Sequence, residues 1–281
     1  MTAIDRILAS RVALVTGTSP NIGTGIALAL ACAGATVVCA DRDKALAELA
    51  AKEIRETGGQ ALASACDVRE EEDVERVVHS AENSVGPIDI LINGAVVYNA
   101  KGVRDMPLDE WRVQLAVLLD GAFLCTKYVV RRLIALGRPG AIINLISTAG
   151  HQGEPNNIGY ATAKAGLLNF TRSAAVELAA FGIRVNSLTP TATDPTEAIE
   201  RARRWGLSEP PVEVGGELDR AALRVPMGRL PKPSDYGAAA VFLASEAAAM
   251  ITGIDLPVDA GSLANYWRNV PPPQTRNEGS I

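Results

Sequence analysis

The stretch RVALVTGTSPNIGTG, residues 11–25, sets a pattern that the rest of the chain repeats. Its first six residues form a short, β-rich apolar run of the kind found in buried parallel strands, and Gly17 ends that run. Apolar residues at helical spacing follow from residue 22 to residue 33 and stop at Gly34, a residue suited to the position after a helix. The stretch therefore predicts a strand, a tight glycine turn and a helix.

The same alternation continues outward from this unit. Further strands are expected at residues 36–40, 61–65, 88–92, 141–146, 183–188 and 254–258, and helices at residues 43–57, 70–85, 109–136, 159–181 and 234–248. Strands that alternate with helices imply βαβ units, and hence one parallel sheet covered by helices on both faces. Because no linker or internal repeat interrupts the pattern, residues 1–281 are predicted to form a single α/β domain.

Two segments depart from the alternation. Residues 191–229, rich in proline and charge, follow the end of a strand directly. A loop of that length in a compact domain is usually a lid or a binding element. The tail, residues 264–281, contains three successive prolines and cannot form a core, so it is expected to be mobile or to lie across a partner subunit.

The composition narrows the classes of function. Of the 281 residues, 48% are apolar and 21% are charged, with a net charge of −5, and this balance argues against a nucleic-acid partner. Asp5 and Arg6 stand where a signal peptide needs an apolar run, and the apolar stretch 26–40 is too short to span a membrane. The four cysteines lie singly in apolar segments without metal-like spacing. A cytoplasmic protein with reduced core thiols and no metal site is expected.

The turn after the first strand has the features of a pyrophosphate site. Gly17 and Gly23 allow a tight turn and close backbone approach, so a pyrophosphate can rest at the N-terminus of the next helix. The second strand ends in Asp41, where a carboxylate can accept hydrogen bonds from a ribose diol and repel a 2′-phosphate. NAD(H) is therefore expected over NADP(H), although Arg42 can pair with such a phosphate. The plainer alternative for Asp41 is a helix N-cap or a turn residue.

A second chemical signal lies in STAGHQGEPNNIGYATAK, residues 147–164. Tyr160 and Lys164 are four residues apart and share one face of a predicted helix, which puts a phenol beside an ammonium group. A phenol titrates near ~10, and a lysine stabilises its phenolate by the roughly 4 kcal/mol needed near neutral pH only in a partly desolvated cleft. Ser147 ends an apolar run and can hold the reacting oxygen there. The alternative is an ordinary Tyr and Lys on a helix surface.

Taken together, these features resemble the short-chain dehydrogenase/reductase family over nearly the whole chain, from residue 11 to about residue 263. The resemblance implies a doubly wound, Rossmann-type parallel sheet of about seven strands, commonly in a homotetramer or homodimer. It also implies hydride transfer between a nicotinamide cofactor and a small secondary alcohol or ketone. The matching segments are TGTSPNIG, Asp67-Val68, Asn93-Gly94-Ala95, the Ser147, Tyr160 and Lys164 set, RVNSLTP, PMGRLPKPSDYGAAAVFLAS and ITGIDLPVDAG.

The resemblance implies a role for each matching residue. Tyr160 would be the general acid/base, Lys164 would lower its pKa and hold the nicotinamide ribose, and Ser147 would hydrogen-bond the substrate oxygen. Residues 67 and 68 would flank the adenine, residues 93–95 would lie beneath the cofactor, and residues 190–193 would meet the carboxamide. The implied cofactor set is Gly17, Ser19, Asn21, Ile22, Gly23, Asp41, Arg42, Asp67, Val68, Asn93, Gly94, Ala95, Tyr160, Lys164, Pro190, Thr191 and Thr193.

Four positions depart from the family pattern. Asn21 stands where Gly is usual and is expected at positive φ, which Asn tolerates better than other non-Gly residues. Val96 ends a motif that is usually Asn-Asn-Ala-Gly, and Thr191 replaces a Gly at the nicotinamide end. Leu118 takes the place of the Asn of the catalytic tetrad, so it loses an amide thought to fix a water on the proton route. Slower turnover and an NAD-binding protein without catalysis are both compatible with this change, and an isomerase or lyase is a third interpretation.

Three residues are candidate substrate contacts. His151 lies near the expected mouth of the pocket and is interpreted as a substrate contact or exposed loop residue rather than a second acid/base. Tyr98 and Trp205 are candidate apolar walls, with core packing as the equal alternative. The arginine run at residues 201–204 is expected to form ion pairs with acidic residues four positions earlier on the same helix, in preference to binding a phosphate.

Overall fold

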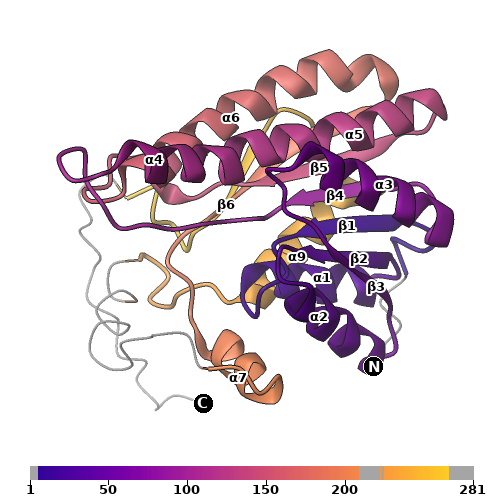
Figure 1. Cartoon of the computed structure of the whole chain (residues 1–281), viewed down its shortest axis with the longest axis horizontal. Helices are drawn as coiled ribbons and strands as arrows, with labels where there is room; N and C mark the ends of the chain where they lie inside the picture. The colour runs from indigo at the N-terminus through magenta and orange to yellow at the C-terminus, as the bar shows by residue number, and fades with distance from the viewer. Residues whose placement is uncertain (1–5, 209–221, 223–224, 266–281) are drawn as a thin grey trace, which may run out of the picture.

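The computed structural model describes residues 6–208, 222 and 225–265. Its centre is a parallel sheet of seven strands in the order β3-β2-β1-β4-β5-β6-β7 (Figure 1). The order reverses between β1 and β4, and ligands of such sheets bind at the carboxyl ends of the strands beside that point. The strands are β1 (Val12–Thr16), β2 (Thr36–Asp41), β3 (Gln60–Ala65), β4 (Ile90–Asn93), β5 (Gly140–Leu145), β6 (Ile183–Pro190) and β7 (Asp255–Val258).

Helices connect successive strands, as the sequence predicts, with bounds that differ from the expected ones by a few residues. The α-helices are α1 (Ile22–Cys32), α2 (Lys44–Glu56), α3 (Glu71–Val85), α4 (Leu108–Leu115), α5 (Gly121–Ala135), α6 (Ile158–Leu178), α7 (Thr196–Arg204) and α9 (Pro233–Ala244). Short turns of other helix types are η1 (Ala116–Asp120), η2 (Thr148–Gly150), η3 (Ala179–Phe181) and η4 (Glu246–Ala248). The predicted α/β class and doubly wound sheet are confirmed.

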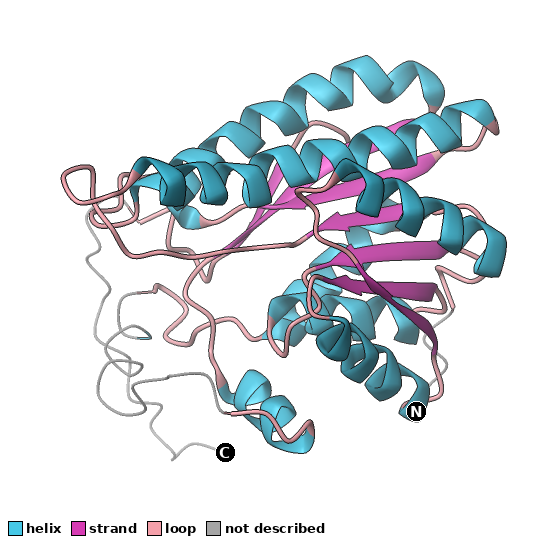
Figure 2. Cartoon of the chain, in the orientation of Figure 1, coloured by secondary structure: helices cyan, strands magenta, loops and turns pink. Residues whose placement is uncertain are grey.

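Each face of the sheet is covered by its own group of helices (Figure 2). Successive residues of a strand point to opposite faces. Val15 therefore packs with Ile26 in the core beneath α1, α2 and α9, while its neighbour Leu14 packs with Val129 in the core beneath α3, α5 and α6. Burial on both faces explains why β1 is a continuous apolar run rather than an alternating one.

The helix predicted at residues 109–136 is not one regular α-helix. It consists of α4, the π-helical turn η1 and α5, with Leu118 in the π turn and only 2% exposed. Single π turns inside α-helices are frequent at functional sites. Residues 108–135 are long and apolar enough to cross a membrane, but a buried core helix passes the same test, and 44% of the most apolar window is buried. The helix packs against α3, α6 and the sheet, so this likeness is weak support for a membrane span.

Two predicted segments, the lid and the tail, are described only in part. Residues 209–221, 223 and 224 of the expected lid and residues 266–281 of the expected tail lie outside the described residues. Within the described lid, α7 forms a short helix (Figure 1). Cys39, Cys66 and Cys125 are buried free thiols as expected, whereas Cys32 at the end of α1 is exposed.

Candidate functional site

The turn between β1 and α1 leaves no space for side chains at its two key glycines. Gly17 has φ +77°, and a Cβ there would lie 2.7 Å from the carbonyl oxygen of Gly94. A Cβ on Gly23 would lie 2.0 Å from the carbonyl oxygen of Gly17. The hydroxyl of Thr24 donates to the carbonyl of Ser19 at 2.7 Å and closes the loop from inside. Both glycines are thus required by the turn.

Asn21 stands immediately before α1 with φ −111° and ψ −133°, so the expectation that it adopts positive φ is wrong. The turn takes its left-handed residue at Gly17 instead. The Asn21 side chain makes no capping hydrogen bond, and the first turn of α1 carries no acidic residue. By contrast, Asp43 caps α2 and accepts from the Ala45 N–H at 2.9 Å. The first N–H groups of α1 are therefore left for an anion, which fits a pyrophosphate.

Asp41 ends β2 beside this turn. Its Oδ1 accepts from the backbone N–H of Asp43 at 3.0 Å. Burial raises the pKa of the Asp41 carboxyl, and that backbone hydrogen bond opposes the rise. Because Asp43 caps α2, Asp41 is not a helix N-cap. Its hydrogen bond from the Asp43 N–H corresponds to the turn-residue alternative and engages one of its two carboxylate oxygens. Arg42 beside it is exposed.

The ends of β1 and β4 are joined through one hydroxyl. Thr16 Oγ1 donates to the carbonyl of Ile92 at 3.2 Å and accepts from the N–H groups of Gly94 at 3.1 Å and Ala95 at 3.3 Å. This contact brings the predicted cofactor floor, residues 93–95, against the glycine turn. Because the contact is made by a buried threonine rather than by a glycine motif, the sequence reasoning did not identify Thr16.

Asp67, predicted to flank the adenine, is engaged by a neighbour that the sequence reasoning missed. Arg69 pairs with its carboxylate at 2.5 Å and holds the pKa of Asp67 below its ordinary value. The Asp67 N–H donates to Asp73 at 3.0 Å. The two-residue spacing of Asp67 and Arg69 was visible in the sequence, but an acidic and a basic residue at that spacing carry no signal of their own.

Ser147, Tyr160 and Lys164 meet at the carboxyl edge of β5. Ser147 Oγ accepts from the Ala149 N–H at 3.2 Å. Burial raises the pKa of Tyr160, and the nearby Ser147 side chain opposes the rise. The three predicted side chains are therefore close to one another, but the pKa of the Tyr160 phenol is raised rather than lowered.

The position of Lys164 explains this result. Its side chain is 3% exposed, and Nζ donates to the carbonyl of Leu145. Nζ lies 5.6 Å from the centroid of the Tyr160 ring. Burial lowers the pKa of Lys164 to about 7. The amine is thus held against the end of β5.

Tyr98 and His151, two of the candidate substrate contacts, have different surroundings. The rings of Tyr98 and Tyr160 meet edge to face, with centroids 5.6 Å apart. His151 Nε2 lies 3.1 Å from Asp255 Oδ2 and 3.2 Å from Thr189 Oγ1. Tyr98 is therefore beside the phenol, as a substrate wall requires, whereas the histidine ring is tied to β6 and β7.

Trp205 does not lie beside the phenol. Its indole N–H donates to Glu53 of α2 at 2.8 Å, and the ring packs against the core beneath α1. This geometry corresponds to the packing alternative. Arg201 and Arg204 pair with the same Glu53, at 3.3 Å and 2.8 Å, so the predicted pairing within α7 is replaced by one between helices. Three contacts to one carboxylate anchor α7 to α2.

The loop after β6 is held by a side chain that the sequence reasoning did not select. Tyr236 of α9 is fully buried, and its hydroxyl lies 3.1 Å from Thr193 Oγ1 and 3.4 Å from the carbonyl of Thr191. Thr193 Oγ1 also donates to the carbonyl of Thr191 at 3.2 Å. The predicted carboxamide contacts are thus fixed in place from α9.

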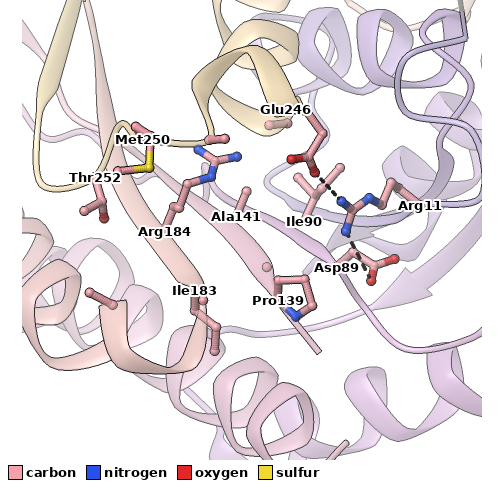
Figure 3. Close-up of a pocket in the computed structure, with 15 residues that line it drawn as sticks. Arg11, Asp89, Ile90, Pro139, Ala141, Ile183, Arg184, Glu246, Met250 and Thr252 are labelled. Carbon is pink, nitrogen blue, oxygen red and sulfur yellow. Dashed lines mark hydrogen bonds and ion pairs between the residues drawn. The ribbon is translucent and has the colours of Figure 1, made fainter. Parts of the chain in front are cut away.

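A cavity of about 320 Å³ lies at the amino ends of β4, β5 and β6, opposite the carboxyl ends that carry the candidate site (Figure 3). Arg11 spans it with ion pairs to Glu246 at 2.8 Å and to Asp89 at 3.9 Å. Arg184 donates to the carbonyls of Leu243 and Ser245 at the end of α9. These charged groups are used in structural contacts far along the strands from Tyr160.

Comparison with known proteins agrees with this geometry. A family model described as enoyl-(acyl carrier protein) reductase matches residues 17–262. The chain is 37% identical to cis-4-hydroxycyclohexanecarboxylate dehydrogenase of Sinomonas cyclohexanicum, over 91% of this chain and 98% of that protein. A solved short-chain type dehydrogenase/reductase from Mycobacterium marinum superposes with TM-score 0.80 at 30% identity, covering 94% of this chain and 100% of the other. The chain belongs to the short-chain dehydrogenase/reductase family.

A second solved member of the short-chain dehydrogenase/reductase family carries ligands. The gluconate 5-dehydrogenase of Burkholderia cenocepacia J2315, in complex with NADP and tartrate, superposes with TM-score 0.82 at 32% identity and covers 94% of this chain and 99% of the other. Short-chain dehydrogenases/reductases are oxidoreductases with NAD(P) cofactors, and two of the named relatives, the cis-4-hydroxycyclohexanecarboxylate dehydrogenase and the gluconate 5-dehydrogenase, are dehydrogenases of hydroxylated compounds. This chain is accordingly an oxidoreductase of alcohols or carbonyl compounds.

Proposed function

We propose that the protein transfers a hydride between NAD(H) and a small secondary alcohol or ketone, with Tyr160 as general acid/base. The observation that carries this proposal is the meeting of a phenol, a hydroxyl and a buried amine at the strand edge that the glycine turn also reaches. The Ser147 side chain lies close enough to the Tyr160 phenol to act on its pKa, and Lys164 Nζ lies 5.6 Å from the centroid of the Tyr160 ring. Such an arrangement suits proton exchange with an oxygen beside a bound nicotinamide.

In the direction of oxidation, Ser147 would hold the substrate hydroxyl and Tyr160, as phenolate, would take its proton. The bound nicotinamide ring supplies the acceptor for the hydride that leaves the same carbon, so the alcohol becomes a ketone. Because burial raises the pKa of Tyr160, the phenolate needs a nearby cation, and Lys164 is the buried candidate. Tyr98 would exclude water from one side of the reacting oxygen.

For the cofactor, we propose NAD(H) over NADP(H), with at least a tenfold preference, about 1.4 kcal/mol. The support is Asp41, a partly buried carboxylate at the end of β2 that would hydrogen-bond a ribose diol and repel a 2′-phosphate. The gluconate 5-dehydrogenase structure contains NADP, so the preference must be measured for this chain. Equal or tighter binding of NADPH would contradict it.

The competing proposal is a protein that binds NAD without turning it over. Leu118 favours it, because a fully apolar side chain stands at the position of the tetrad amide. Its burial in the π turn η1 is equally compatible with a slower enzyme. Leu118→Asn should raise turnover if the missing amide limits the reaction, and leave it unchanged if it does not.

We also propose that the chain assembles as a homodimer or homotetramer and that residues 191–229 act as a lid over the substrate. Apolar side chains are exposed on α5 and at the end of α6, and they suit an interface between copies of the chain. Phe123 and Phe181, for example, are each 50% exposed. Light scattering of the purified chain tests the assembly directly. A monomer at all concentrations would contradict it.

The experiment that tests the function follows nicotinamide absorbance with NAD⁺ and pooled secondary alcohols at mildly alkaline pH. The matched control is Tyr160→Phe, which removes the hydroxyl and keeps the ring contact with Tyr98. We expect the variant to lose roughly 10²–10⁴-fold in rate while still binding NADH. If the wild-type protein binds NADH but none of the alcohol pools supports reduction of NAD⁺, the non-catalytic proposal is favoured instead.

A further inference from the structure

One buried polar atom beside Lys164 lacks a partner among the described residues. Asn93, at the end of β4, is 5% exposed, and its Oδ1 accepts no hydrogen bond within the described part of the chain. Its Nδ2, by contrast, donates to Asn144 Oδ1 at 2.8 Å and to Thr126 Oγ1 at 3.1 Å. A buried acceptor left without a donor costs about 1–3 kcal/mol, so such an atom needs an explanation.

The direction of the surrounding hydrogen bonds fixes which way this amide points. The carbonyl of Leu167 can only accept, so Thr171 donates to it at 2.8 Å. The Thr171 hydroxyl oxygen then accepts from Asn144 Nδ2 at 2.9 Å, which leaves Asn144 Oδ1 to accept from Asn93. Exchanging the nitrogen and oxygen of Asn93 would break this chain. Its Oδ1 therefore faces away from the network.

A small cavity is lined by both Asn93 and Lys164. The cavity has a volume of about 10 Å³, the space of roughly one water molecule, and Asn93, Lys164, Thr16 and Leu118 contribute to its wall. The Thr16 hydroxyl is already occupied by the backbone of β4. Lys164 Nζ has three N–H donors, one of which goes to Leu145. The polar groups of the wall that still lack partners are thus the remaining N–H donors of Lys164 and the acceptor Oδ1 of Asn93.

We propose that one water molecule in this cavity accepts a hydrogen bond from Lys164 Nζ and donates one to Asn93 Oδ1, which makes Asn93 a positioning residue for the lysine. The inference deepens the proposed function, since it concerns the amine that would support Tyr160. Leu118 forms the apolar side of the same cavity. The polar partner of the buried amine then comes from β4, while the π turn supplies only packing.

The water has a defined effect on the amine. A hydrogen-bond acceptor beside a buried ammonium favours its charged form, so removing the acceptor lowers the pKa of the lysine further. With less charge on Lys164, the Tyr160 phenolate is less stable. The low-pH limb of kcat/KM for alcohol oxidation then moves to higher pH, and kcat falls while the KM for NAD⁺ changes little.

The first test is titration of the Lys164 amine by NMR in the cofactor-free full-length protein, with Lys164→Met used to assign its signal. Asn93→Leu should lower the pKa by about one unit, a tenfold change in protonation. Thr126→Val is the matched control, because it removes another hydrogen bond of Asn93 and leaves Oδ1 in place. Adding Leu118→Asn to Asn93→Leu should restore the pKa, since both side chains line the cavity. Equal titration of Lys164 in wild type and Asn93→Leu would overturn the proposal.

The second test needs no variant. An atomic-resolution crystal structure of the wild-type protein should show one water within about 3.2 Å of both Lys164 Nζ and Asn93 Oδ1. A dry cavity in such a structure would also overturn the proposal. Neither test uses a substrate, so a protein that oxidises no alcohol would refute the proposed function while leaving the inference about Asn93 to be decided separately.

Discussion

The glycine turn and the surroundings of Tyr160 are two neighbouring sites that differ in whether their buried polar groups have hydrogen-bond partners. At the turn, buried polar groups such as Thr16 and Thr24 find partners in the backbone around them. Near the phenol, buried Gln114 and Asn157, each 1% exposed, keep side-chain atoms without a partner among the described residues. The difference indicates that the nucleotide end is formed by folding itself, whereas the reacting end requires water or ligand.

The two sites also differ in how charge is treated. At the nucleotide end, α1 presents uncapped N–H groups, and a backbone hydrogen bond from Asp43 opposes the rise that burial causes in the pKa of Asp41. At the reacting end, burial disfavours both charged forms, because it raises the pKa of Tyr160 and lowers that of Lys164. Mutations at the turn should therefore affect folding and cofactor binding together, and mutations at the reacting end should separate stability from activity.

The largest expected effect comes from Gly23→Ala. The new Cβ would lie 2.0 Å from the carbonyl oxygen of Gly17, where backbone must move to admit it. We expect a loss of roughly 3 kcal/mol in the free energy of unfolding, measured in urea, and the loss of NADH binding measured by fluorescence. The control is Gly153→Ala, where a Cβ meets nothing within 4 Å. Near-wild-type NADH affinity in Gly23→Ala would show that the turn is not the binding element.

Lys164→Met should change how stability depends on pH. The lysine titrates near ~10.4 in the unfolded chain, but burial lowers its pKa to about 7 in the folded protein. Between these values the unfolded state binds more protons, so the wild-type free energy of unfolding rises with pH, by at most about 1.4 kcal/mol per unit. The stabilisation is absent below the folded pKa and complete above the unfolded one.

Methionine removes this slope. The wild type should therefore gain about 2–3 kcal/mol relative to Lys164→Met between roughly pH 7.5 and 9.5, as measured by urea unfolding of the cofactor-free protein. Lys44→Met, at an exposed lysine, should run parallel to wild type. Parallel curves for all three proteins would mean that the Lys164 amine is not desolvated.

Asp41→Asn has a smaller effect, and it acts on the choice of cofactor. Removing the carboxylate removes the repulsion of a 2′-phosphate, so the ratio of NADPH to NADH affinity should rise about tenfold, or 1.4 kcal/mol. Titration of both reduced cofactors by fluorescence gives the ratio. Asp43→Asn is the control, because this residue caps α2 and should alter stability without altering the ratio. An unchanged ratio in Asp41→Asn would remove Asp41 from the specificity argument.

The sequence predicts much of the fold and the gathering of the site, for identifiable reasons. Strand and helix order follow from apolar runs and periodicity, and the seven strands form the expected parallel sheet. Spacing along one helix and the end of one strand were enough to bring Tyr160, Lys164 and Ser147 together. Local patterns carry this information because each depends on neighbours within a few residues.

Contacts between distant segments were not predictable in the same way. Trp205 donates a hydrogen bond to Glu53 of α2, and Tyr236 of α9 contacts the loop after β6. The backbone of Asn21 was predicted wrongly because Gly17 already supplies the left-handed residue of the turn. The π turn around Leu118 has no signature in a helix-like apolar pattern. For Trp205 and Tyr236, tertiary packing rather than local preference decides the outcome.

The smallest expected effect, and the sharpest test of the difference between the two sites, is that of Gln114→Met. Gln114 is buried in α4, and its amide lies 3.1–3.2 Å from the position that a Cβ on Gly159 would occupy, one residue before Tyr160. Methionine has a similar shape and no amide, so it removes two unpartnered polar atoms without opening a cavity. If the amide is truly without partners, urea unfolding should show a gain of about 1 kcal/mol. Gln152→Met, at an exposed loop position, should show no gain. A loss of stability in Gln114→Met would instead mean that bound water already satisfies this amide, and the reacting end would then be as complete as the glycine turn.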